Sequence, residues 1–422
     1  MKIYLSEVKI NGIKCIDNEI SLKFTSFSLK NKEENNIKAI YGPNGSGKSA
    51  IVLSLLIYKK LMISEDGLSL SSLKKVLTKN INKKTNQFDF EIIFVVNDNK
   101  IYKHHLQIIN DKNNLFIKKE NIFFINGNSL TNAIFKNIVS IENGKIISLI
   151  HKNSLISKEI INNTNNLFNK KSIVNCIANS NYGHELFDAL KSIKALANNI
   201  IVNIDEQIID EKDNSSLISE SSSLKYEKEF SVNGLDEVYI NQFDDYCYKI
   251  NQLYKFIKVF KPEINNIEIE KKQKEYIYYC NKLFDYIDYK IDIQSESNGI
   301  KKLVSLFNSL FLCSNGKIVF IDELDSNIHS VYFNKLIEFI KNYSCGQLCF
   351  TTHNISTIDV IKDKSYSIEF LSNDSKITSW RKNGNSSPTQ KYIYGLIENS
   401  NFNVESFDFI SSLVEDSDTY ED

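Results

Sequence analysis

The feature that most constrains this chain is a glycine-rich stretch, Gly42-Pro-Asn-Gly-Ser-Gly47-Lys48-Ser49, which fits the pattern G-x-x-x-x-G-K-[ST]. The β-rich run Ile37–Tyr41 precedes it, and residues 49–62 follow it with helical length and no helix-breaking residue. Glycines let backbone amides turn inward, and these amides bind anionic oxygens together with the N-terminus of the following helix. An ordinary surface turn is the alternative, but it does not explain the strand before the loop and the helix after it. The sequence therefore predicts a phosphate-binding loop.

The residues of this loop have separate expected roles. Lys48 is expected to reach the β- and γ-phosphates of a nucleoside triphosphate and to act in catalysis, while the Ser49 hydroxyl is expected to bind Mg²⁺. The predicted cofactors are therefore ATP and Mg²⁺. The residues predicted to contact the nucleotide are Gly42, Pro43, Asn44, Gly45, Ser46, Gly47, Lys48, Ser49 and Ala50.

A second stretch, Ile318-Val-Phe-Ile-Asp322-Glu323, is an apolar run that ends in two adjacent acids. A continuous apolar strand of this kind is typical of a parallel sheet that is covered on both faces. Asp322 is expected to hold Mg²⁺ through water, and Glu323 is expected to polarise the water that attacks the γ-phosphate. The alternative is a strand that runs into an acidic turn. Its position downstream of the glycine-rich loop favours the metal and catalytic roles.

Composition narrows the class of protein. The sequence has 51 Lys and Arg residues against 52 Asp and Glu residues, so no global basic field indicates nucleic acid. Its seven cysteines include no CxxC pair, which favours reduced thiols. The N-terminus lacks the apolar core of a signal peptide, and no apolar run reaches membrane-spanning length. We therefore expect a cytoplasmic protein without a membrane partner.

The order of patterns along the chain predicts an α/β fold with a mixed sheet. The stretch 88–119 is typical of an antiparallel β-meander, because Asn- and Asp-rich turns separate its β-rich runs. Helical spacing over 240–257 predicts a compact helical insert, and the Ser-rich stretch 213–228 predicts a loop. Further strands are expected at 289–294 and 347–353, and further helices at 298–313 and 328–342. The expected divisions are an N-terminal lobe (1–125), the helical insert (126–287), a C-terminal lobe (288–380) and a partly helical tail (381–422).

A third stretch, Glu296-Ser-Asn-Gly-Ile-Lys-Lys-Leu303, resembles the signature loop of ABC-type ATPases in its SMC-like form. Ser297 and Gly299 match the signature serine and the second glycine, whereas Asn298 departs from the first glycine. The resemblance implies that this loop binds the γ-phosphate held by an opposite subunit. A serine at the N-terminus of a helix also forms an anion site on physical grounds. The alternative is an ordinary helix start with Ser297 as its N-cap.

Two later segments extend the resemblance. The stretch Leu324–Ser330 is similar to the D-loop that crosses the dimer interface of ABC proteins, with His329 where many of them carry aspartate. In Thr351-Thr-His353-Asn, His353 matches the switch histidine, which implies a catalytic role through a hydrogen bond to the γ-phosphate. The Q-loop glutamine of these ATPases has no clear counterpart, and Gln87 and Gln107 are the nearest candidates.

Two further features leave alternatives open. The tandem His104-His105 lies in the meander, where we expect solvent exposure and no metal site. The lysine pairs Lys83–Lys84 and Lys301–Lys302 are the candidates for phosphate contacts if the protein binds DNA. Nucleic acid is therefore retained as an alternative partner.

Together, these motifs resemble those of the ABC-type (SMC/OLD-like) AAA-family ATPases, and in particular the AbiLi-type ATPases of bacterial anti-phage defence. OLD nucleases carry a metal-dependent Toprim domain after the ATPase, and the 69 residues that follow His353 are too few for one. The resemblance therefore implies that any nuclease or toxin effector is a separate protein, as in abortive-infection systems.

The resemblance also implies a homodimer, or a higher homo-oligomer, that closes head to tail around two ATP·Mg²⁺. Each nucleotide would lie between Ser297 of one subunit and five residues of the other, namely Lys48, Ser49, Asp322, Glu323 and His353. Two other functions stay open. One is an ATP-bound scaffold with little turnover, and the other is a RecF- or SMC-like DNA-binding ATPase in DNA repair.

Overall fold

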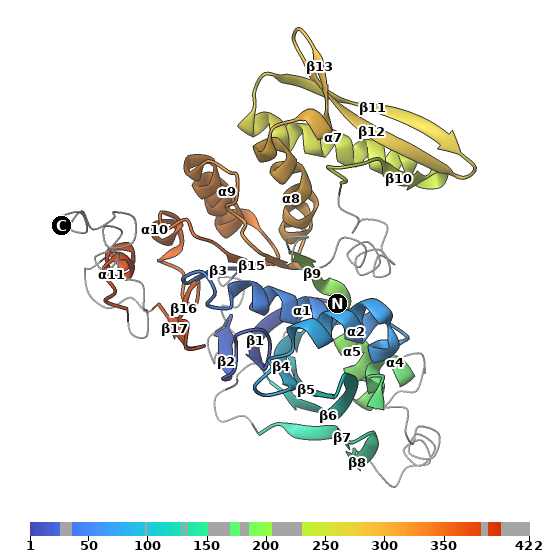
Figure 1. Cartoon of the computed structure of the whole chain (residues 1–422), viewed down its shortest axis with the longest axis vertical. Helices are drawn as coiled ribbons and strands as arrows, with labels where there is room; N and C mark the ends of the chain where they lie inside the picture. Colours follow the sequence, from blue (N-terminus) through green and yellow to red (C-terminus); the bar gives the residue numbers. More distant parts are fainter. Residues whose placement is uncertain are drawn as a thin grey trace, which may run out of the picture.

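The computed structural model describes residues 1–25, 36–97, 99–127, 130, 134–150, 169–177, 185–204, 230–380 and 387–397. Within these residues the strands form three sheets, of seven, six and four strands. Figure 1 shows the six-stranded sheet in the middle of the molecule. The seven-stranded sheet and its helices lie on one side of it, and the four-stranded sheet lies at the opposite end.

The six-stranded sheet is parallel from β16 to β9, and β17 is added antiparallel at its edge, in the order β17-β16-β3-β15-β14-β9. Its strands are β3 (Ile37–Tyr41), β9 (Ile200–Asn203), β14 (Ile318–Ile321), β15 (Gln347–Thr351), β16 (Ile368–Leu371) and β17 (Ile377–Ser379). In β14, Ile318 and Phe320 join one hydrophobic core, and Val319 and Ile321 join another on the opposite face. Burial on both faces explains the continuous apolar run that the sequence shows here.

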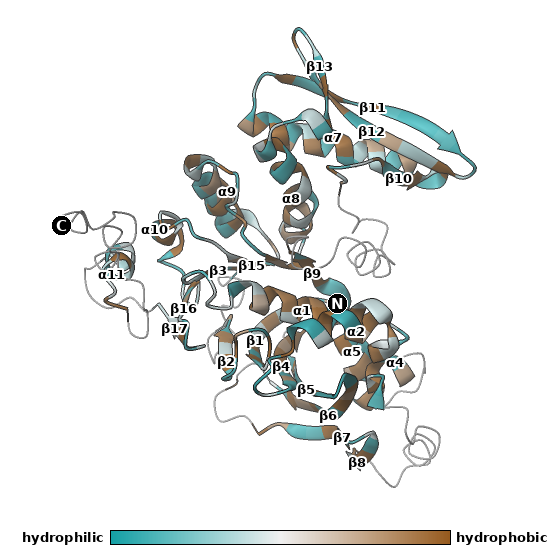
Figure 2. Cartoon of the chain, in the orientation of Figure 1, coloured by the Kyte–Doolittle hydropathy of each residue, from teal (hydrophilic) through white to brown (hydrophobic). Residues whose placement is uncertain are grey.

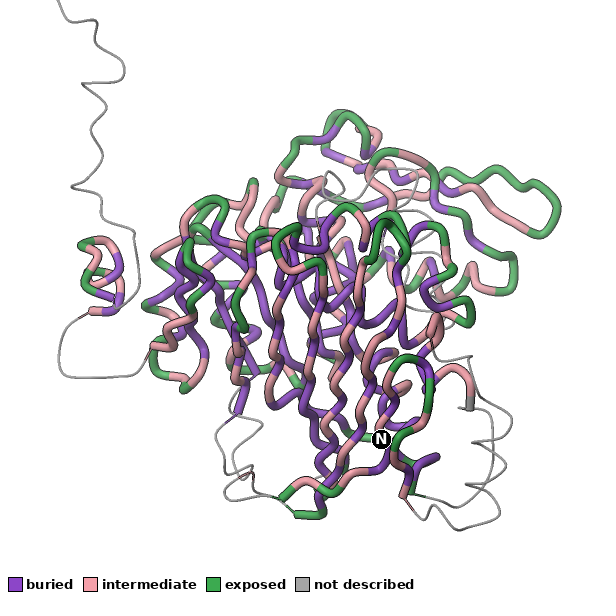
Figure 3. The backbone as a smooth tube through the Cα atoms, turned by 60° about the horizontal axis from the view of Figure 1, so that its bottom comes forward, coloured by how far each residue is buried: buried purple, intermediate pink, exposed green. Residues whose placement is uncertain are grey.

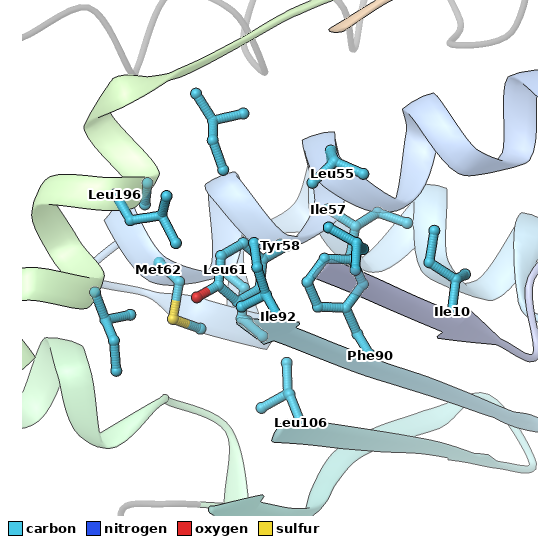
Figure 4. Close-up of a cluster of buried hydrophobic side chains, with 14 of the residues drawn as sticks. Ile10, Leu55, Ile57, Tyr58, Leu61, Met62, Phe90, Ile92, Leu106 and Leu196 are labelled. Carbon is cyan, nitrogen blue, oxygen red and sulfur yellow. The ribbon is translucent and has the colours of Figure 1, made fainter. Parts of the chain in front are cut away.

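The helix α1 (Lys48–Ile63) begins at the glycine-rich loop, as expected, and all of its residues except Ser49 and Ile63 are buried. It lies between the parallel sheet and the seven-stranded sheet, and its residues are mostly hydrophobic (Figure 2). Figure 4 shows Ile57, Tyr58 and Leu61 of this helix packed against side chains of the seven-stranded sheet. The helix that carries the glycine-rich loop is therefore packed between the two sheets, which also meet directly where the Gln347 side chain of β15 bonds the backbone of Leu5 in β1.

The seven-stranded sheet is antiparallel and has the order β2-β1-β4-β5-β6-β7-β8. Its strands are β1 (Ile3–Asn11), β2 (Ile20–Lys23), β4 (Gln87–Val96), β5 (Lys100–Asp111), β6 (Asn114–Asn126), β7 (Lys136–Glu142) and β8 (Lys145–Leu149). The expected β-meander over 88–119 is confirmed, and β7 and β8 extend it. Buried and partly exposed residues alternate along much of these strands (Figure 3) because one face of the sheet packs on the main core. At one end of the sheet the other face is buried as well, in a smaller cluster of Tyr4, Ile93, Val95, Ile101 and Ile125.

The region 126–287 differs from the expected helical insert. Besides α4 (Ile173–Ile177), α5 (Glu185–Asn199) and α7 (Phe243–Phe260), it holds the end of the meander and the edge strand β9. It also supplies a sheet that covers α7, formed by β10 (Asp236–Tyr239), β11 (Ile264–Lys274) and β12 (Ile277–Tyr286), with β13 (Lys290–Asp292) beside β12. The strand β11 falls within the range expected to be a helical insert, but its pairing with β12 makes it the edge of a sheet. The loop expected at 213–228 lies outside the described residues.

The remaining helices are α2 (Ser71–Asn80), α8 (Asn298–Ser314), α9 (Ser330–Tyr343), α10 (Thr357–Ile361) and α11 (Pro388–Ile393). The helices α8 and α9 match their expected positions, and they cover the face of the parallel sheet opposite α1. The helix α11 agrees with a partly helical tail. Among the described helices, none is both long and apolar enough to cross a membrane.

A buried polar cluster joins α1 to the meander and corrects the expectation that His104 is exposed. The imidazole of His104 is fully buried, 3.0 Å from the Tyr58 hydroxyl through Nδ1 and 3.1 Å from Glu120 Oε1 through Nε2. The Glu120 carboxylate also accepts hydrogen bonds from the Ser172 hydroxyl and the Ile173 amide. The histidine is therefore structural.

We expect Glu120→Ala to lower the free energy of unfolding by about 3 kcal/mol, because it leaves the buried Ser172 and Ile173 donors without an acceptor. The control is Glu142→Ala, which removes an exposed ion pair with Lys119 at 3.6 Å and should change stability by less than about 0.5 kcal/mol. Urea unfolding measures both. Equal small effects of the two variants would contradict the structural role of the cluster.

Candidate functional site

Three strand ends of the parallel sheet bring the expected catalytic segments together. The strand β15 lies between β3 and β14, and all three run in the same direction. The carboxyl ends of parallel strands emerge at one edge of a sheet, where ligands bind in open α/β folds. The glycine-rich loop after β3, the acids after β14 and the segment Thr352–His353 after β15 therefore lie at the same edge.

The glycine-rich loop has the geometry of a phosphate-binding loop. Gly47 has φ 105°, and a Cβ at this position would lie 3.0 Å from Ile16 Cγ1, so only glycine fits without strain. The Lys48 ammonium donates hydrogen bonds to the carbonyls of Gly42 at 2.8 Å and Pro43 at 3.0 Å. The lysine thus reaches back over the loop at the N-terminus of α1, where an anion is favoured. These residues fit the triphosphate of a nucleotide.

The two acids after β14 lie in the electric field of Lys48. Asp322 is buried, and its Oδ1 accepts a hydrogen bond of 2.6 Å from the Thr351 hydroxyl. Glu323 is exposed and has a left-handed backbone, with φ 47°. Burial lowers the pKa of Lys48, while the carboxylates of Asp322, Glu323 and Asp325 oppose that shift. The structure therefore gathers the lysine with both acids, as the sequence predicts.

His353 lies in the same field. Its side chain is exposed, and its backbone N–H donates to Asp325 Oδ2 at 3.2 Å. Partial desolvation and then the charge of Lys48 lower the pKa of the imidazole, whereas Asp325 and Glu323 oppose the shift. Its pKa is therefore below the usual 6.5, and the imidazole is neutral at pH 7.

The expected signature residues occupy a different place. Ser297 is exposed and caps α8, with its Oγ accepting the Ile300 N–H at 3.4 Å. A Cβ on Gly299 would lie 3.1 Å from the Asn327 carbonyl, so the D-loop packs closely on this helix start. Ser297 and Gly299 line an open groove with His329 and other residues, and none of the lining residues belongs to the glycine-rich loop. The N-cap reading of Ser297 is right, and the exposed groove leaves the signature role open.

Sequence reasoning missed a lysine beside the glycine-rich loop. Cys15 Sγ lies 3.1 Å from the Gly45 carbonyl, which seats the turn after β1 against that loop. In this turn, burial lowers the pKa of Lys14, and the Asp322 carboxylate opposes the shift. Lys14 is thus a second cation facing the acidic strand end. No local pattern marks Lys14, because its place beside the site depends on the contact of Cys15 with Gly45, which lies thirty residues further along the chain.

The two glutamines considered for the Q-loop, Gln87 and Gln107, lie in different surroundings. The Gln107 side chain donates to Asp89 Oδ2 at 2.9 Å, within the antiparallel sheet. The Gln87 carbonyl would lie only 1.8 Å from a Cβ on Gly12, at the base of the turn that carries Lys14. Gln107 is therefore engaged away from the loop, and Gln87 stays a prediction.

The lowered pKa of His353 predicts a pH dependence of stability. The unfolded state binds a proton at this histidine with a pKa of about 6.5, and the folded state binds it only at lower pH, so stability falls as pH drops below about 6.5. We expect His353→Asn to make the pH dependence of the unfolding free energy shallower in this window. An NMR titration that places the His353 pKa at or above 6.5 would contradict the assignment.

Comparison with known proteins gives one family. Residues 37–359 match a family model described as "AAA domain, putative AbiEii toxin, Type IV TA system". No curated protein matches the chain. Among solved structures, the Smc head domain of Pyrococcus furiosus bound to the C-terminal domain of ScpA is 14% identical, with a TM-score of 0.42, and the match covers 90% of this chain and 96% of that one.

Two other solved structures are similar at the same level. The SMC head domain of Thermotoga maritima is 15% identical, with 90% and 100% of the two chains covered and a TM-score of 0.36. The recombination mediator protein RecF with ATP is 15% identical, with 90% and 99% covered and a TM-score of 0.39. The family match spans most of the chain and includes the glycine-rich loop, both acids and His353. The chain therefore belongs to the family of AAA domains described as putative AbiEii toxins of type IV toxin–antitoxin systems.

Proposed function

We propose that this protein hydrolyses ATP at the interface of a head-to-tail dimer, in which each chain completes the site of the other. The main support for this dimer is that the expected site residues lie in two separate places on the chain. Lys48, Glu323 and His353 gather at one edge of the parallel sheet, whereas Ser297 is exposed beside a groove that no residue of the glycine-rich loop lines. Ser297 of a second copy is the natural source of the missing donor.

In this proposal the residues of the chain have the following roles. Ser49 and Asp322 hold Mg²⁺, which when bound neutralises phosphate charge and orients the γ-phosphate. The Lys48 ammonium exchanges its bonds to the Gly42 and Pro43 carbonyls for bonds to phosphate oxygens. Glu323 orients the attacking water and accepts its proton. Neutral His353 donates a hydrogen bond toward the γ-phosphate, where charge develops.

We further propose that the dimer acts in anti-phage defence and controls a separate effector. The description of the matching family, which names a toxin of type IV toxin–antitoxin systems, supports the defence role, and the separate effector is part of the proposal. Purification of the tagged chain from its native cells, before and during infection, tests it. A stoichiometric partner protein is expected, and recovery of the chain alone under both conditions would overturn the proposal.

The DNA-repair alternative has less support from the described lysines. The Lys84 ammonium is paired with Asp17 at 2.8 Å, and the Lys83 ammonium donates to the Thr78 carbonyl. We therefore keep DNA binding as a second candidate to be tested by the salt dependence of DNA-stimulated turnover. A scaffold with little turnover is distinguished by the rate of hydrolysis itself.

We expect Glu323→Gln to lower kcat at least about 100-fold, because it removes the general base. The same variant should accumulate an ATP- and Mg²⁺-dependent dimer, measured by light scattering after size exclusion. Lys48→Ala is the matched control, and it should form no dimer because it loses the phosphate contact. Hydrolysis by Glu323→Gln at the wild-type rate would refute the assignment of the base.

A mixing experiment tests the shared site directly. Lys48→Ala and Ser297→Glu should each be inactive alone, since neither variant can complete a site with a second copy of itself. Mixed, they should regain activity, because a heterodimer of the two has one complete site, which joins the glycine-rich loop of the Ser297→Glu chain to Ser297 of the Lys48→Ala chain. No recovery in a mixture that forms heterodimers would show that Ser297 does not act on the nucleotide of the other subunit.

A further inference from the structure

One side chain contacts both acids of the site, and neither the family resemblance nor the sequence singles it out. Thr351 is the last residue of β15 and is fully buried. Its hydroxyl lies 2.6 Å from Asp322 Oδ1 and 2.8 Å from the backbone nitrogen of Glu323. Its carbonyl accepts a hydrogen bond of 3.1 Å from the Leu324 N–H. Thr351 therefore holds three consecutive residues at the end of β14.

The chemistry of the two partners fixes the direction of the hydroxyl. The Glu323 N–H can only donate, so the Thr351 oxygen accepts there. The hydroxyl hydrogen then points to Asp322 Oδ1, which accepts it. The oxygen of one threonine thus orients the Asp322 carboxylate and satisfies the amide of Glu323 at the same time.

Glu323 depends on this contact because its backbone is strained. Its φ of 47° is uncommon for a residue with a side chain and costs about 1–3 kcal/mol. This conformation turns the chain directly after the buried Asp322, so the two adjacent side chains take different directions, one buried and one exposed. The Thr351 hydroxyl and carbonyl bond the backbone on both sides of that turn.

We propose that Thr351 is a positioning residue that presents Asp322 to the Mg²⁺-bound water and Glu323 to the attacking water. This inference rests on the proposed ATPase function, because it assigns the target of each acid. Thr351 is fully buried and its hydroxyl is already bonded to both acidic residues, so its role is exerted through them. Its hydroxyl acts as an outer-shell partner of a metal-binding carboxylate, and loss of such a partner typically lowers metal affinity or activity 10- to 100-fold.

The test compares Thr351→Val, which keeps the shape and removes the hydroxyl, with Thr351→Ser, which keeps the hydroxyl. ATP affinity is measured by titration calorimetry with and without Mg²⁺, and kcat is measured in parallel. Thr351→Val should raise the Mg²⁺ concentration for half-maximal ATP binding about 10-fold or more and lower kcat to a similar degree. Affinity for ATP without Mg²⁺ should stay unchanged, and Thr351→Ser should restore both values to within a few fold of wild type.

Thr357→Val is the matched control for loss of a buried threonine hydroxyl. Thr357 is also fully buried, and its hydroxyl donates to Asn334 at 3.0 Å, away from the acids. This control should leave the Mg²⁺ dependence at the wild-type value. An equal change in Thr357→Val would mean that any destabilisation produces the effect, and it would overturn the positioning role.

The outcomes separate this inference from the proposed function. If Glu323→Gln is inactive but Thr351→Val has the wild-type Mg²⁺ dependence and rate, the ATPase stands and the role of Thr351 is refuted. If the wild-type protein hydrolyses no ATP, the proposed function fails. The Mg²⁺ dependence of ATP binding still decides then whether Thr351 orients Asp322.

Discussion

The parallel pairing of β3, β15 and β14 is the constraint on which the site depends. Because β15 pairs with both neighbours in the same direction, three loops that are far apart in the sequence emerge side by side. The register is held by apolar side chains on both faces of β14 and by the cores on either side. A polar group at a central position of β14 would have no face to occupy without entering one of these cores.

The helix α1 extends this constraint to the rest of the N-terminal region. It is covered by the parallel sheet on one side and by the meander on the other, and Tyr58 joins it to the buried cluster around Glu120. The N-terminus of a helix fixed in this way cannot tilt without disturbing the core that it shares with both sheets. The meander therefore holds the phosphate-binding end of the helix in place.

Sequence reasoning succeeded where the signal is local. The glycine-rich loop, the apolar strand before Asp322 and the helix after Ser297 each carry their pattern within about ten residues, and the structure places each as expected. The sequence predictions were wrong where the burial of a residue depends on segments that are distant along the chain. The hairpin of β11 and β12 carries charges on its exposed edge, and His104 is buried only because Tyr58 and Glu120 meet it from other elements. The contact of Cys15 with the glycine-rich loop is equally non-local.

The helix α8 belongs to two cores, and this has a consequence for regulation. Leu306 and Leu310 pack on the parallel sheet, whereas Leu303 and Phe307 pack under the four-stranded sheet with α7. The first turn of this same helix carries Ser297. A molecule that binds the four-stranded sheet and shifts it relative to the parallel sheet would act on the helix whose first turn carries Ser297. If such a molecule changes the affinity of the proposed dimer for nucleotide, nucleotide binding must change the affinity for that molecule by the same factor. The four-stranded sheet would then be an allosteric site.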